Sequence, residues 1–130
     1  KSFRLIGGKQ AIHTHTQTAN SEPLMAITKQ YGLERVWMNA QRAEELGISD
    51  GDTVEVSNEQ HTGKVQVKVT QRINPDALYM PSHYGCSSPD QHTAYEVGLR
   101  QMDYVPFRIE PGYGGICSQE AVVTVKKVGA

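Results

Sequence analysis

Short segments in which apolar and polar residues alternate run through most of the chain. The clearest is 64–70, where Val65, Val67 and Val69 point one way and the polar residues between them point the other way. This is the pattern of a strand with one buried side. Similar segments predict further strands at 3–6, 36–38, 53–56, 77–80, 107–109 and 121–128. Because Val123 and Val125 share the period of two, we expect them in the same core. Turn residues recur between segments at the spacing of a small closed barrel, which predicts a mainly β fold of six or seven strands.

A helix of about ten residues is predicted after the first strand. It follows Ser21, a residue type that caps helices, and has Pro23 in its first turn, where the missing N–H costs nothing. Leu24, Ile27 and Tyr31 fall on one face, as in an amphipathic helix. A glycine directly after Tyr31 is placed to end it.

A second helix belongs to a compact unit in the middle of the chain. Asn39 follows an apolar strand and can cap a helix over 41–46, which Gly47 can end. Asp50-Gly51 then predicts a tight turn into the strand at 53–56, because Gly tolerates positive φ and Asp bonds its own backbone. Weak helical character also appears near 94–99, inside a long polar stretch.

Composition limits the function classes. The 130 residues form one domain, with a formal net charge of −1 and hence no basic excess to attract nucleic acid or an anionic membrane. No apolar run reaches the roughly 18 residues of a membrane span. No signal peptide is visible, and the start at Lys1 suits a fragment or a processed product. Cys86 and Cys117 lack CxxC spacing, so neither a zinc site nor a disulfide framework is indicated, while a single disulfide between them stays open.

The segment Lys9 to Asn20, KQAIHTHTQTAN, is the most distinctive polar stretch. Its hydroxyls, imidazoles, carboxamides and backbone N–H groups can hold phosphate next to a helix N-terminus. Equally, it can be a solvated loop that caps the next helix. A metal site at His13 and His15 lacks support, because two ligands at i and i+2 do not complete a site and no Cys, Asp or Glu stands beside them.

Three further positions are candidates for binding. His83-Tyr84-Gly85 follows a strand, and Tyr84 can either stack on a flat heterocycle or be a half-buried aromatic in a turn. Ser118-Gln119 follows a glycine-rich turn. Asn39 is favoured as a helix cap, with a second role in ligand binding left open.

These stretches resemble a known family. The glycine–aspartate unit around 47–52 resembles that of double-psi β-barrels. Gly8-Lys9, the run His13-x-His15-Thr16-x-Thr18 and the following Pro23-Leu24 are similar to the opening of the C-terminal cofactor domain of the molybdopterin oxidoreductases, the dimethyl sulfoxide reductase superfamily. The resemblance extends from Leu5 to Val128 and implies a double-psi β-barrel of six or seven strands with two or more short helices.

The resemblance implies a binding role for the chain. In the family, the polar loop contacts a pyranopterin guanine dinucleotide. Lys9 stands where arginine is commoner, and Ser118-Gln119 stand where an asparagine contact occurs. The implied cofactor residues are Gly8, Lys9, His13, His15, Thr16, Gln17, Thr18, Asn20, Asn39, His83, Tyr84, Gly85, Ser118 and Gln119. We expect the loop, Tyr84 and Ser118-Gln119 to line one mouth of the barrel, with no catalytic or metal-ligating residue in this domain.

The loop and tail sequences look most like the thiosulfate, polysulfide or arsenate reductase branch. This implies a single domain, 1–130, at the C-terminus of a longer periplasmic enzyme that holds bis-molybdopterin guanine dinucleotide with molybdenum or tungsten. Upstream domains, an iron–sulfur subunit and a membrane-anchor subunit would be its partners. We expect the isolated domain to be monomeric, without bound cofactor and without activity. The alternative is a stand-alone double-psi barrel that binds proteins or nucleic acid. For nucleic-acid binding, the chain lacks the expected basic face.

Overall fold

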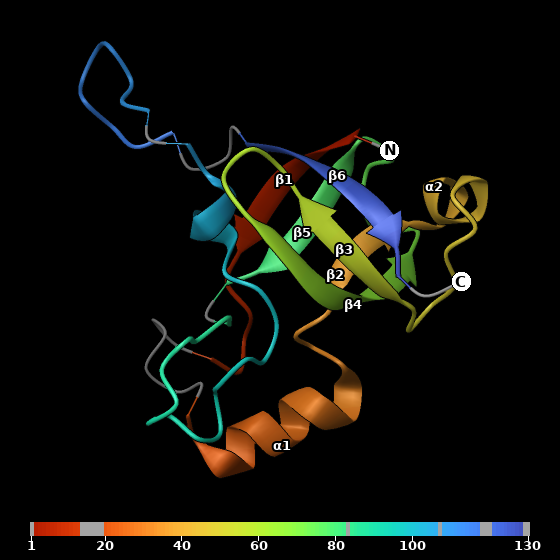
Figure 1. Ribbon diagram of the computed structural model, residues 1–130, viewed down its shortest axis with the longest axis vertical. Coiled ribbons are helices and arrows are strands. Elements are labelled where there is room, and N and C mark those ends of the chain that lie inside the picture. Colours follow the sequence, from red (N-terminus) through yellow and green to blue (C-terminus); the bar gives the residue numbers. More distant parts are fainter. Residues whose placement is uncertain (1, 14–19, 83, 107, 118–120, 129–130) are drawn as a thin grey trace.

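Six strands close into a barrel in the computed structural model, which describes residues 2–13, 20–82, 84–106, 108–117 and 121–128 (Figure 1). The strands are β1 (Ser2–Gly8), β2 (Val36–Asn39), β3 (Thr53–Ser57), β4 (Thr62–Thr70), β5 (Ala77–Pro81) and β6 (Ala121–Lys127). Their order around the barrel is β1-β5-β2-β4-β3-β6. β1 runs parallel to β5 and β2 parallel to β4, while the other neighbours are antiparallel. The predicted mainly β barrel is therefore confirmed.

The barrel interior is filled by the alternate side chains of every strand. Val65, Val67, Val123 and Val125 are buried there as predicted, while Val69 is half-buried and packs against the same core. The other strand residues of this core are Phe3, Leu5, Val36, Met38, Val54, Val56, Leu78, Met80, Ala121. Because successive side chains of a strand point to opposite faces, the apolar residues at every second position line the inside of the barrel.

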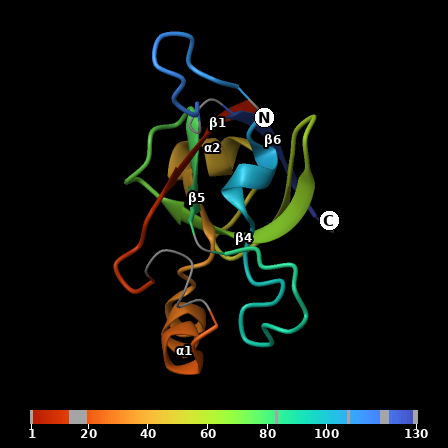
Figure 2. The same cartoon turned by 90° about the vertical axis from the view of Figure 1, so that its left-hand side faces the viewer.

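α1 (Glu22–Tyr31) lies beyond one end of the barrel rather than across its wall (Figures 1 and 2). It ends at a left-handed Gly32, φ 61°, as expected. Its buried residues are Met25 and Thr28, whereas Ile27 and Tyr31 are 39% and 65% exposed. The apolar face expected from the sequence is therefore not the packed one, because Met25 packs against Tyr84 and Ala94 of the connection that follows β5, and Thr28 bonds His13.

α2 (Ala40–Glu45) and the turn after it dock on β4. Asn39 caps the helix, which starts one residue earlier than expected. In the turn, the Gly51 N–H donates to the Val67 carbonyl at 2.8 Å, and the Asp50 carboxylate accepts from the Val69 N–H at 2.9 Å. The glycine–aspartate unit is thus tied to β4 by a main-chain bond and by an aspartate side chain.

The connection between β5 and β6 contains turns and one short 3-10 helix, η1 (Gln101–Tyr104). The helical turn expected near 94–99 is wrong, because Glu96 and Gly98 take left-handed backbone angles, φ 55° and 68°, that a right-handed helix excludes. The strand expected at 107–109 is also wrong for its described residues. Ile109 makes only a single bridge to Ile116, and Phe107 lies outside the described residues.

The strand register separates two ends of the barrel. At the α1 end, Gly8 of β1 pairs with Pro81 of β5. At the α2 end, β2 terminates at Asn39, one residue beyond the Met38–Leu78 pair and therefore at the start of β5. Residues that share an end can form one site, whereas residues at opposite ends cannot.

Candidate functional site

Most of the described candidate residues gather at the α1 end. Gly8 and Lys9 leave the barrel there, and the Ser82 N–H donates to the Gly8 carbonyl at 2.9 Å, which joins the chain after β5 to the chain after β1. His13, Asn20, Tyr84 and Gly85 lie in these same two connections or bond to them. Outside the described residues lie His15, Thr16, Gln17, Thr18, His83, Ser118 and Gln119. The expected convergence is thus seen for the stretches at 8–13 and 84–85, and it stays a prediction for the others.

A buried polar cluster joins three segments at this end. His13 Nε2 lies 2.8 Å from the Thr28 hydroxyl of α1, and that hydroxyl lies 3.4 Å from the Tyr84 hydroxyl. Tyr84 donates to the Gln10 side-chain oxygen at 2.9 Å, and the Gln10 amide donates to the Leu33 carbonyl at 2.7 Å. The His13 and Tyr84 rings meet edge to face with centroids 5.5 Å apart.

Burial decides what these side chains can touch. His13 is 2% exposed and Tyr84 is 5% exposed. Burial raises the pKa of Tyr84 and the Thr28 hydroxyl opposes this, so the phenol stays a neutral donor at physiological pH. Of the two roles that the sequence left open for Tyr84, the structure shows the buried aromatic one. A direct contact between Tyr84 and a ligand stays a prediction.

Sequence reasoning missed Gln10 and Thr28. Thr28 is fully buried within α1, although β-branched hydroxyl residues are weak helix formers. Its position next to Met25 on the packed face, one turn along, is the only local signal for its role. Gln10 carries no signal of its own, since it sits in a run of polar residues.

Asn20, at the end of the polar stretch 9–20, is bonded to the connection after β5. Its side-chain oxygen accepts from the Thr93 and Ala94 N–H groups at 3.0 and 3.2 Å. The described residues on both sides of 14–19 are therefore bonded to other parts of the chain: His13 to α1, and Asn20 to the connection after β5.

Gly85 allows two stretches of backbone to approach closely. It has φ 83°, and its N–H donates to the Val97 carbonyl at 2.8 Å. A Cβ added there would lie 2.7 Å from the carbonyl carbon of Leu99 and would also meet the Arg100 backbone. Only glycine fits this position without a shift.

A cavity of about 650 Å³ opens beside Gly85, between the β3–β4 hairpin and the connection at 85–103. Its wall includes His61, Lys64 and Arg100, of which Arg100 lies 3.9 Å from the Asp103 carboxylate. The volume lies in the range of small-molecule and cofactor sites. The wall carries charges of both signs, Lys64 and Arg100 beside Glu96 and Asp103.

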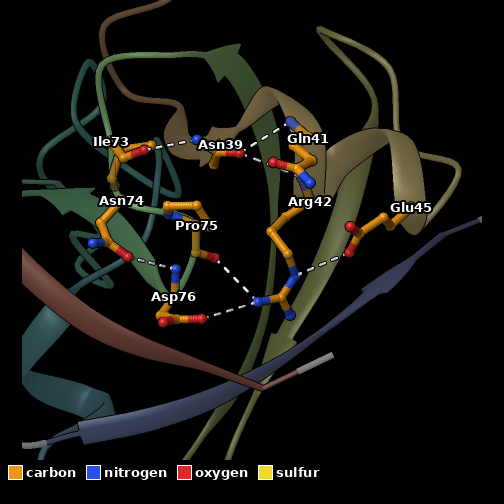
Figure 3. A network of polar contacts seen from close by, with 8 residues as sticks. All are labelled: Asn39, Gln41, Arg42, Glu45, Ile73, Asn74, Pro75 and Asp76. Atoms are coloured by element: carbon orange, nitrogen blue, oxygen red, sulfur yellow. Dashed lines mark hydrogen bonds and ion pairs between the residues drawn. The ribbon is translucent and has the colours of Figure 1, made fainter.

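Asn39 lies at the α2 end of the barrel, beside the start of β5, and belongs to a network of polar contacts there (Figure 3). Its side-chain oxygen accepts from the Gln41 and Arg42 N–H groups at 3.0 and 3.4 Å, and its amide donates to the Ile73 carbonyl at 2.9 Å. Arg42 bonds the Pro75 carbonyl at 3.1 Å and stacks over the Phe3 ring at 4.4 Å. The helix-cap role favoured from the sequence is shown, and Asn39 lies at the opposite end of the barrel from the other candidates whose positions the structure describes.

Some chemistry is absent from the described part of the chain. No three His, Cys, Asp or Glu side chains there come close enough to hold a metal ion. Both cysteines are free thiols, so the disulfide that the sequence left open is not formed. Among the described residues, no helix has the length and apolar character needed to cross a membrane.

Comparison with known families decides the kind of site. The family model described as "Molydopterin dinucleotide binding domain" matches residues 3–105. The chain belongs to this family of molybdopterin dinucleotide binding domains. The match spans the barrel from β1 to η1, including both described stretches that meet at the α1 end, and it confirms the resemblance found in the sequence.

This molybdopterin dinucleotide binding domain spans less than a fifth of the two natural proteins compared with it. The thiosulfate reductase molybdopterin-containing subunit PhsA of Salmonella typhimurium strain LT2 is 27% identical over 111 residues, which cover 85% of this chain and 14% of that subunit. Acetylene hydratase from Pelobacter acetylenicus matches 96% of this chain and 18% of its own, with a TM-score of 0.75 at 12% identity. The rationally designed double-psi β-barrel mkDPBB_sym_86 matches 98% of this chain and 91% of its own, with a TM-score of 0.51 at 15% identity. The fold is therefore the predicted double-psi β-barrel.

The described residues fit a dinucleotide at the α1 end of this domain. Lys9 is exposed there, and it is a cation that can face a pyrophosphate. The cavity beside Gly85 has the size for part of such a ligand and carries Lys64 on its wall. In the buried cluster, His13 Nε2 and the Thr28 and Tyr84 hydroxyls have hydrogen-bond partners within the protein, so the cluster fits a supporting role rather than a contact with phosphate.

Proposed function

We propose that this chain binds and orients the pyranopterin guanine dinucleotide of a molybdenum or tungsten cofactor at the α1 end of its barrel. One observation carries the proposal: in a chain that matches the dinucleotide-binding family over 3–105, the segments 8–13 and 84–85 meet at one end of the barrel. Ligand sites are typically built in this way, from loops held by a rigid scaffold.

The proposed mechanism divides the work between cofactor and protein. When bound, the cofactor supplies the redox chemistry. Lys9 would serve as a point charge near the pyrophosphate, while Thr16, Gln17 and Thr18 would provide hydroxyl, amide and backbone donors. The Gly85 turn keeps the chain after β5 close to Leu99 and Arg100, and so shapes the wall of the adjoining cavity.

We further propose that the chain acts as a domain of a larger oxidoreductase that reduces a sulfur compound such as thiosulfate or polysulfide. The similarity to a thiosulfate reductase subunit supports this, since 85% of this chain aligns to 14% of that protein. A periplasmic location, an iron–sulfur subunit and a membrane-anchor subunit complete the proposal, and they rest on the resemblance of the sequence alone.

Cofactor content in the full-length enzyme tests the binding role. Lys9→Gln should lower the dinucleotide retained after gel filtration several-fold, measured as pterin fluorescence after oxidation and as guanosine monophosphate released by acid. Lys126→Gln, an exposed lysine on β6, is the matched control and should retain the unaltered content. Equal retention in the two variants would argue against a phosphate contact at Lys9. An unaltered enzyme that releases no pterin and no guanosine monophosphate would refute the proposed function.

A further inference from the structure

The buried cluster at the α1 end forms a chain of hydrogen bonds with one direction. Because Tyr84 donates its hydroxyl proton to Gln10, its oxygen is left to accept from Thr28. His13 Nε2 lies 2.8 Å from the Thr28 hydroxyl, and the Nε2–H tautomer of the imidazole lets the Thr28 oxygen accept from His13 while the Thr28 proton is donated to Tyr84. The side-chain amide of Gln10 in turn donates a hydrogen bond to the Leu33 carbonyl. Each donor meets one acceptor, and such series are cooperative in a low-dielectric interior.

These bonds hold segments that the barrel itself does not hold. Thr28 belongs to α1, which lies outside the barrel wall (Figure 2). Tyr84 belongs to the connection after β5, and it packs with Met25 and Ala94 in a small apolar cluster separate from the barrel core. The same connection also bonds Asn20 through Thr93 and Ala94. The described residues directly flanking 14–19 are therefore bonded to α1, through His13, and to this connection, through Asn20.

We infer that His13, Thr28 and Tyr84 form a latch that positions the polar loop for the dinucleotide, rather than contacting the dinucleotide themselves. This inference rests on the proposed function. Burial supports it, because the three side chains are 2%, 0% and 5% exposed. Their hydrogen bonds also show that Thr28 and Tyr84 direct their hydroxyls at each other and at protein groups. The latch ties residues 10–13 to α1 and thereby sets where the following loop begins.

Hydroxyl deletions with a conservative rescue test the latch. Thr28→Val keeps the shape of the side chain but removes the link between His13 and Tyr84, and Tyr84→Phe keeps the ring contact with His13 but removes the bond to Gln10. Thr28→Ser restores the hydroxyl. Tyr31→Phe is the matched control, because Tyr31 lies on the same helix, 65% exposed and outside the cluster.

Two readouts on the full-length enzyme separate positioning from general damage. Amide hydrogen exchange of residues 10–13 should be faster by about tenfold in Thr28→Val and in Tyr84→Phe, as expected when one net hydrogen bond is lost. Exchange in β3 and β4 should not change. Dinucleotide retention after gel filtration should fall in the same two variants, and should return in Thr28→Ser.

The possible outcomes are distinct. Unchanged exchange at 10–13 in Tyr84→Phe overturns the latch, whatever happens to the cofactor and even if Thr28→Val fails to fold. Faster exchange with full dinucleotide retention overturns its role in positioning the loop. Slower loss of cofactor in Tyr31→Phe than in Thr28→Val, together with rescue by Thr28→Ser, supports it. If the unaltered enzyme holds no dinucleotide, the proposed function fails, while the exchange data still report on the latch itself.

Discussion

At the scale of single residues, hydrogen-bond partners decide the role of a side chain more than its type does. Asn39 and Asn20 are both polar candidates in the sequence, yet they serve different ends of the barrel. Asn39 caps α2 and bonds the Ile73 carbonyl, while Asn20 bonds the connection that carries Tyr84. His13 and Tyr84 were expected to face a ligand, and they are buried against each other.

Replacing Asn39 tests its structural role. Asn39→Ala removes the cap and the bond to Ile73, so the free energy of unfolding should fall by about 1–2 kcal/mol. Asn39→Asp keeps the acceptor for the Gln41 and Arg42 N–H groups but cannot donate to Ile73, and should lose less. Urea denaturation of the two variants measures the difference. Equal losses would show that the bond to Ile73, and not the cap, carries the stability.

At the scale of elements, the strands follow the sequence closely and the long connection does not. Alternation in 64–70 and 121–127 is sufficient to place the strands, because successive side chains of a strand point to opposite faces and the apolar ones then line the barrel interior. The face that α1 buries could not be predicted in this way. The buried face packs against the connection at 84–97, which is distant in sequence. The spacing of Leu24, Ile27 and Tyr31 carries no information about that partner.

The left-handed residues of the connection were likewise not visible in the sequence. Glu96 takes φ 55°, and its N–H donates to the Cys86 carbonyl at 2.9 Å. A residue type that favours helices is thereby held in a conformation that ends them. The candidate site was predicted where two stretches converge, at 8–13 and 84–85, but Gln10 and Thr28, which join those stretches, become apparent only in three dimensions.

Alanine substitutions at two glycines, Gly85 and Gly51, test how tightly this connection is packed. Gly85 and Gly51 have nearly the same backbone angle, φ 83° and 85°, but a Cβ at Gly51 meets nothing within 4 Å. Gly51→Ala should therefore lose only the cost of the left-handed backbone, about 1 kcal/mol in urea denaturation.

Gly85→Ala adds a clash with the backbone of Leu99 and Arg100 to that cost. It should lose roughly 1–3 kcal/mol beyond Gly51→Ala if the connection stays in place, as for other overpacked sites. If the connection detaches instead, the Gly85 amide, which bonds Val97, should lose its protection from exchange. A Gly85→Ala variant with the stability of Gly51→Ala and full protection at residue 85 would contradict the close approach.

At the scale of the whole molecule, the barrel has two ends with different tasks. The α2 end is closed by main-chain bonds of the Gly51 turn and by the Arg42 and Asn39 contacts (Figure 3). The α1 end carries the polar connections, the buried latch and the cavity beside Gly85. The chain belongs to the family of molybdopterin dinucleotide binding domains. The difference between the two ends supports the α1 end as the place where the ligand binds.

The most direct test is a comparison of amide hydrogen exchange between the full-length enzyme purified with its cofactor and the same enzyme made in a host that cannot synthesise the cofactor. Within this chain, the cofactor should protect the amides of residues 9–13 and 84–86 at the α1 end. The amides of α2 and of residues 72–76 at the α2 end should exchange equally in both preparations. Protection confined to the α2 end, or no difference at residues 9–13 and 84–86, would contradict the proposed site.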